Sequence, residues 1–64
     1  MTRNYYKEIN NALIRYEHNM PYKTHDVHWI CNRISWCWKW KKITRKQMEE
    51  LASRIIKVME DEMN

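Results

Sequence analysis

The chain has 64 residues and contains no glycine and a single proline, Pro21. Glycine adopts left-handed backbone conformations at no steric cost, so tight hairpin turns and loops that wrap a phosphate depend on it. The composition therefore excludes a Rossmann unit and a P-loop, and it disfavours an all-β fold. A chain of this kind is expected to build helices joined by short breaks.

Residues 5–18 have the pattern of a first amphipathic helix. Asn4 can cap its start, and Asn19 followed by Pro21 can end it. The apolar residues recur at spacings of three and four, which places them on one face. They are Tyr6, Ile9, Leu13, Tyr16 and Met20.

A second helix is expected over residues 25–40. It starts near Thr24 and carries Asp26 in its first turn, where a carboxylate suits the helix dipole. One apolar stripe follows the helical period and is expected to face the core. This stripe consists of Val27, Ile30, Cys31, Ile34, Cys37 and Trp38.

The third helix, over residues 45–62, has the clearest start. Thr44 and Gln47 have the spacing of a capping box, and Ile43 and Met48 have that of a hydrophobic staple. The expected apolar face follows the same helical period. It consists of Met48, Leu51, Ala52, Ile55, Met59 and Met63, widened by Ile56 and Val58.

Together these helices predict an all-α fold, a small three-helix bundle forming a single domain over residues 1–64. Two breaks of a few residues each suit antiparallel neighbours. A helical hairpin with a detached first helix is the alternative. A domain of about 60 residues buries only about 60% of the surface of its unfolded chain, so we expect a partner or a second copy to cover the remaining apolar surface.

The two cysteines and the start of the chain indicate the compartment. Cys31 and Cys37 lie about 9 Å apart along the helix axis, and a disulfide needs Cα atoms within about 7 Å. We therefore expect free thiols and a reducing, cytoplasmic environment, and residues 1–13 carry no apolar run of the length of a signal peptide. We expect no membrane partner, because the apolar residues of the second helix spread over two faces.

Basic residues gather between the second and third helices. Residues 33–46 contain six basic and no acidic side chains, whereas residues 47–64 contain two basic and five acidic ones. The acidic run 60–62 ends the third helix, where it opposes the helix dipole. In an antiparallel dimer of third helices, each acidic run would reach the basic turn of the partner, residues 39–46, so we expect a homo-oligomer.

A second stripe of the second helix carries three of the four tryptophans. At 100° per residue, its members fall within about 60° of one another, on a side of the helix distinct from the first stripe. They are Trp29, Arg33, Trp36 and Trp40. Tryptophan and arginine are enriched at binding hot spots, so this face predicts a protein-binding site, with the basic turn guiding approach to an acidic partner surface. Alternatively, the second helix lies between the other two, with the first helix on one stripe and the third helix on the other, which makes this face part of the core.

The same region also has features of a nucleic-acid interface. Bases stack on aromatic rings while cations follow the phosphates. The candidate residues for this alternative are Arg33, Lys39, Lys41, Lys42, Arg45 and Lys46. The net charge of only +4 weakens this hypothesis, as do Glu49 and Glu50, which follow at once.

Other site chemistry is poorly represented. His25, His28 and Cys31 match no zinc signature, so we expect no metal ion and no other cofactor. Ser35 and Ser53 have no base in register, and so short a chain has little room for a substrate pocket of about 300 Å³. We expect no enzymatic activity.

The segment HWICNRISWCWKWKKITRKQMEEL, residues 28–51, resembles short accessory proteins encoded by phages and mobile elements of Gram-positive bacteria. The resemblance lies in a chain rich in Lys, Asn and Ile, a Trp-rich second helix and a tightly capped third helix. It implies a binding protein directed at a host or defence protein, often an inhibitor that occupies its partner's surface. Such proteins also include small DNA-binding regulators. Mimicry of DNA is disfavoured, because DNA mimics are acidic and this chain is basic.

Overall fold

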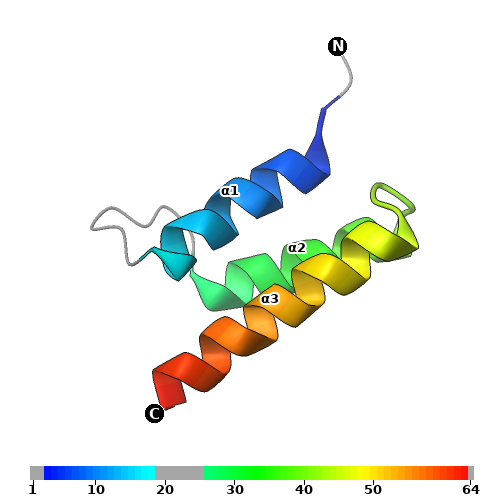
Figure 1. The fold of residues 1–64 in the computed structure, drawn as a ribbon. Coiled ribbons are helices and arrows are strands. Elements are labelled where there is room, and N and C mark those ends of the chain that lie inside the picture. Colours follow the sequence, from blue (N-terminus) through cyan, green and yellow to red (C-terminus); the bar gives the residue numbers. More distant parts are fainter. Residues whose placement is uncertain (1–2, 19–25, 64) are drawn as a thin grey trace.

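The computed structural model describes residues 3–18 and 26–63, and this part of the chain forms three α-helices and no strand (Figure 1). The helices are α1 (Tyr5–Glu17), α2 (Val27–Lys39) and α3 (Arg45–Met63). The predicted all-α, three-helix fold is confirmed, and every predicted helix end that can be compared lies within two residues of the observed one. The expected end of the first helix at Asn19 and Pro21, and the position of His25, lie outside the described residues.

Side-chain caps begin the first two helices. The Asn4 side chain accepts a hydrogen bond from the backbone N–H of Lys7 at 3.0 Å, which confirms the predicted cap of α1. Asp26 accepts one from the backbone N–H of Trp29 at 2.7 Å. Asp26 is therefore the cap of α2 rather than a residue of its first turn, because an N-cap acceptor serves the amide three residues later.

The predicted capping box begins α3. The backbone N–H of Thr44 donates to the Gln47 side chain at 3.0 Å, and that of Gln47 donates to Thr44 Oγ1 at 3.1 Å. Ile43, just before the cap, is 6% exposed, and Met48 packs against the core. Both staple residues are thus drawn to the core, and together with the box they fix how the chain enters α3.

The turn after α2 closes in a left-handed conformation without glycine. Lys41 has φ 57°. Its N–H donates to the Trp38 carbonyl at 3.2 Å, and the N–H of Lys42 donates to the Cys37 carbonyl at 2.7 Å. This pair of bonds is the Schellman pattern, in which glycine commonly takes the left-handed position. Here a lysine of the basic turn occupies it.

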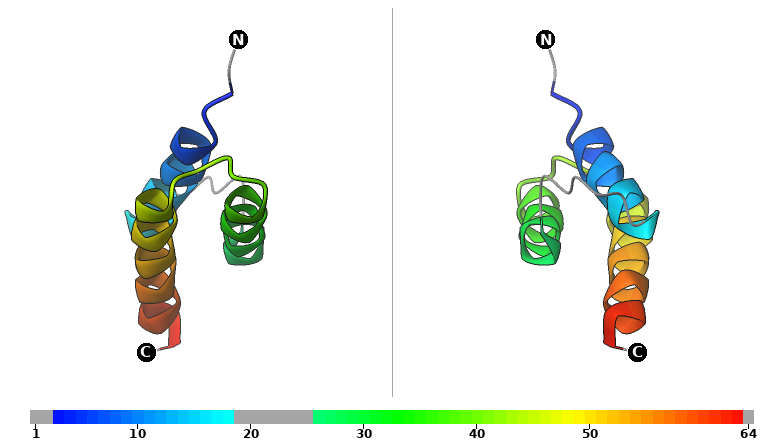
Figure 2. Two further views of the ribbon diagram at one scale, coloured as in Figure 1. Left: turned by 90° about the vertical axis from the view of Figure 1, so that its right-hand side faces the viewer. Right: turned by 90° about the vertical axis from the view of Figure 1, so that its left-hand side faces the viewer.

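The successive helices are antiparallel, as the short breaks predicted (Figure 1). Each helix packs against both of the others. The two views of Figure 2 show α2 and α3 side by side, with α1 lying over one side of the pair. The C-terminal end of α3 extends beyond the other two helices.

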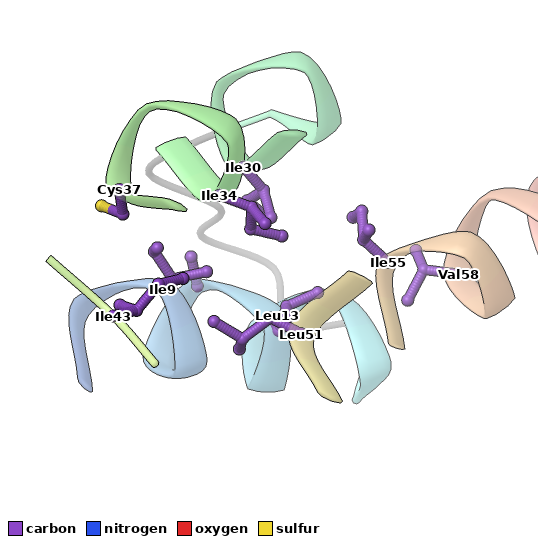
Figure 3. Packing of buried hydrophobic residues seen from close by; sticks show 10 residues of the cluster. Ile9, Leu13, Ile30, Ile34, Cys37, Ile43, Leu51, Ile55 and Val58 are labelled. Carbon is purple, nitrogen blue, oxygen red and sulfur yellow. The ribbon is translucent and has the colours of Figure 1, made fainter. Parts of the chain in front are cut away.

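A single buried cluster joins the three helices (Figure 3). Side chains from α1, α2, α3 and the turn before α3 point toward one another in this view. The buried residues are Ile9, Ala12, Leu13, Ile30, Ile34, Cys37, Ile43, Leu51, Ile55 and Val58. Cys31 and Cys37 are both free thiols; the burial of Cys37 raises its pKa above the ordinary value.

Three of the described residues assigned to apolar faces are exposed, and those assignments were wrong; the side chains of Met20 and Met63 lie outside the described residues. Trp38 is 43% exposed, Ile56 54% and Met59 43%. Periodicity gives the angle between residues on one helix, but it does not show how far the neighbouring helices wrap around it. Because α1 covers one side of the α2–α3 pair, residues at the opposite edges of the apolar stripes stay in solvent.

Candidate functional site

Alternating cations and aromatic rings run across the side of α2 that faces α1. The Arg33 guanidinium carbon lies 5.5 Å from the ring centroid of Trp29 and 5.5 Å from that of Trp36. Trp36 meets Tyr5 of α1 with ring centroids 5.7 Å apart and planes tilted by 45°. Arg3 lies 5.0 Å from the Tyr5 centroid. We call these five residues the cation–aromatic ladder.

The helical period places three residues of the ladder on one side of α2. Trp29 and Trp36 lie four residues before and three residues after Arg33, so both indoles meet its guanidinium on one side of α2. Cation–π attraction holds the planar guanidinium against the rings. The predicted aromatic face therefore exists as a surface with its cation at the centre.

Tyr5 and Arg3 were missing from the predicted site. They join it through the packing of α1 on α2, and Tyr5 is separated from Trp36 by 31 positions of sequence. No local spacing indicates such a contact. The one signal in the sequence was that Tyr5 is an aromatic residue at the start of the first helix that the expected apolar face does not include.

Exposure differs along the predicted aromatic face. Trp29 is only partly exposed and packs against the core, so the alternative of a covered face holds in part for this residue. Trp36 is 39% exposed and Trp40 57%. Trp40 is the C-cap residue of α2, and the ammonium nitrogen of Lys39 lies 5.7 Å from its ring centroid. The indoles available to a partner are thus Trp36 and Trp40.

The basic turn adjoins this surface. A hollow of about 300 Å³ lies between the start of α1 and the turn, although so short a chain was expected to have little room for a pocket of that size. Tyr5 of the ladder lines it together with Lys42 and Gln47. Lys41, Lys42 and Lys46 are exposed. Arg45 forms an exposed ion pair with Glu49 at 3.1 Å. The ladder and the turn therefore make one continuous aromatic and cationic surface.

The residues of the nucleic-acid hypothesis do not all share one role in the structure. Arg33 stacks within the ladder, Lys39 lies over Trp40, and Arg45 is paired with Glu49. The exposed ammonium groups of Lys41, Lys42 and Lys46 form no ion pair among the described residues. This leaves three lysines of the six candidates with an uncommitted charge.

No family model, curated protein or solved structure matches this chain. The resemblance to accessory proteins of phages and mobile elements stays a prediction.

The described residues bring together few groups for other chemistry. Among them, no three His, Cys, Asp or Glu side chains cluster where they could hold a metal ion. His28 is exposed and Cys31 half-buried, while His25 lies outside the described residues. Within the same ranges, no helix combines the length and the apolar character needed to cross a membrane.

Proposed function

We propose that the chain is a non-catalytic protein-binding module that docks on an acidic surface of another protein. The contact surface is the exposed part of the cation–aromatic ladder together with Trp40 and the basic turn. The observation that carries the proposal is the pair of exposed indoles, Trp36 and Trp40, each beside a cation of this chain. Tryptophan and arginine are enriched at binding hot spots, and surrounding lysines add electrostatic attraction to an acidic partner.

The side chains of the ladder are already ordered before a partner binds. Trp36 is held between Tyr5 and Arg33, so little side-chain entropy remains to be lost when its exposed edge is covered. The lysines around it lengthen the range over which an acidic surface attracts the module. Coverage of the partner's surface would inhibit the partner, as the resemblance to accessory proteins of phages and mobile elements implies.

The same contacts disfavour base stacking on these rings. A base needs an open ring face, and a cation of this chain already lies against Trp29, Trp36 and Trp40. A base would therefore have to stack on the opposite face of each ring or displace the cation. The exposed Lys41, Lys42 and Lys46 are the observation that keeps nucleic-acid binding as the second candidate.

The test begins with fluorescence anisotropy of labelled single- and double-stranded DNA and RNA at low and physiological salt. We expect no micromolar binding. Binding that weakens steeply with salt and is lost in Lys41→Ala or Lys42→Ala would transfer the function to the basic turn and overturn the proposal.

A partner captured by the folded chain is then purified and titrated by calorimetry. Trp36→Ala is expected to weaken a one-to-one complex about 30-fold, the loss of a hot-spot residue of about 2 kcal/mol. Trp38→Ala is the matched control, because its indole is similarly exposed but points about 200° away around α2. Equal losses in the two variants would contradict a site on the ladder.

A further inference from the structure

The charges of α3 run against its own dipole. Its first turn contains no acidic residue and its last turn no basic one. Arg45 and Lys46 stand at the positive end of the helix, and Glu60 and Asp61 stand near the negative end. In α1 the arrangement is favourable, with an acidic residue in the first turn and a basic residue in the last turn. The isolated fold thus gives α3 an unfavourable pattern at both ends.

The same helix carries an apolar stripe that the bundle does not cover. Ile56 and Met59 are 54% and 43% exposed, and Met48 and Ala52 are half-buried. Spacings of four, four and three residues place these side chains along one side of α3. Arg54 donates a hydrogen bond to Glu17 of α1 and lies on the opposite side of α3. Figure 2 shows no described element over the side of the α2–α3 pair that lies away from α1.

The stripe and the charges share one centre on the helix. Met48 and Met59 are equally far from a point beside Ser53, and Lys46 and Glu60 are equally far from Ser53 itself. A two-fold axis through this point would pair each Met48 with the partner's Met59. It would also bring each Lys46 to the partner's Glu60. The small side chain of Ala52 lies next to the axis and permits close approach of the two helices.

We propose that two copies of this chain form a symmetric dimer in which their α3 helices pack antiparallel through this stripe. A two-fold contact uses the same patch on both copies, and this patch carries basic residues near one end and acidic residues near the other. Each acidic end of α3 then lies at the positive start of the partner's α3, which reverses the unfavourable pattern of the isolated helix. The stripe lies on the side of α3 opposite Arg54, whose guanidinium bonds to α1, whereas the ladder spans α2 and α1, so the ladder stays free in the dimer.

Sedimentation equilibrium of the full chain at tens to hundreds of micromolar tests the proposal. We expect a monomer–dimer equilibrium for the natural sequence and a monomer for Ile56→Glu. Ile56 is exposed, so circular dichroism should show this variant to be folded. Asn11→Glu is the control, since it adds negative charge at an exposed side chain of α1, a helix that does not carry the stripe. A monomer at every concentration, or equal dimers in both variants, would overturn the proposal.

Charge reversal tests the antiparallel register. Lys46→Glu is expected to raise the dimer dissociation constant about tenfold, because the lost pair occurs twice in a symmetric dimer. Glu60→Lys should do the same, and the double variant should restore the dimer. Failure of the double variant to recover affinity excludes this register. Trp36→Ala should leave the dimer unchanged, so failure of the dimer and failure of the protein-binding site can be told apart.

Discussion

The guanidinium of Arg54 in α3 donates two hydrogen bonds to the carboxylate of Glu17 at the end of α1, at 2.7 and 3.1 Å. The two side chains are 22% and 32% exposed. Arg54 also donates to Asn10, and the Tyr6 hydroxyl donates to Glu50 one turn earlier on α3 at 2.8 Å. This polar seam fixes α1 across α3, and thereby also sets where Tyr5 meets α2.

The Arg54–Glu17 pair predicts a loss of stability in acid. The hydrogen bonds from Arg54 hold the pKa of Glu17 below its ordinary value of 4.5. A carboxyl whose pKa is lowered by folding contributes its stability above the unfolded pKa and loses it as the pH falls through the folded pKa. Glu17→Gln should cost about 1 kcal/mol at pH 7 and flatten the pH dependence below pH 4.5. Urea unfolding at pH 7 and at acid pH measures both effects.

The exposed pair Arg45–Glu49 provides the control for that experiment. Its side chains are 79% and 60% exposed, so Glu49→Gln should change the free energy of unfolding by no more than about 0.5 kcal/mol. If Glu49→Gln alters the acid transition as much as Glu17→Gln does, the seam has no special role.

Local signals predicted the helices well, because a cap and its target amide lie three residues apart. Thr44 and Gln47 illustrate this, since both bonds of their box are present. Contacts between helices could not be predicted in the same way. The exposure of Trp38 and Ile56 and the ring contact between Tyr5 and Trp36 depend on which side of the α2–α3 pair α1 covers.

The sequence also did not indicate the left-handed conformation at position 41. A glycine there would have indicated it, but a lysine does not. Within the predicted face of Trp29, Arg33, Trp36 and Trp40, Arg33 contacts Trp29 and Trp36, as their spacing on one helix predicts, and the role of this face in protein binding stays a prediction. The extension of this surface to Tyr5 of α1 could be found only from the packing of the helices.

Replacement of Lys41 by glycine should stabilise the protein. A non-glycine residue in the left-handed region costs about 1–2 kcal/mol, and the greater freedom of glycine in the unfolded chain offsets about 0.4–1 kcal/mol of the gain. We expect a net gain of about 0.5–1 kcal/mol for Lys41→Gly in thermal and urea unfolding. Lys42→Gly, one residue on, lacks a left-handed backbone to relieve and should destabilise. The same sign for both variants would be inconsistent with the strained turn.

Loss of the capping box should weaken α3. Thr44→Ala removes the hydroxyl that accepts from the Gln47 amide and should cost about 1 kcal/mol of unfolding free energy. Thr44→Ser keeps the acceptor and should restore most of that loss. Ser53→Ala, in the exposed middle of the same helix, should have no destabilising effect. Chemical unfolding followed by circular dichroism distinguishes the three variants.

The last prediction separates a binding surface from a core. Trp36→Ala removes contacts with Tyr5 and Arg33 at the surface and should cost about 1 kcal/mol. Trp40→Ala, at the more exposed indole, should cost less. Ile30→Ala empties a fully buried site and should cost about 2–5 kcal/mol, enough to unfold much of a small domain. Urea unfolding of the three variants ranks these losses. A loss for Trp36→Ala as large as that for Ile30→Ala would place the ladder in the core and remove the basis for a protein-binding surface.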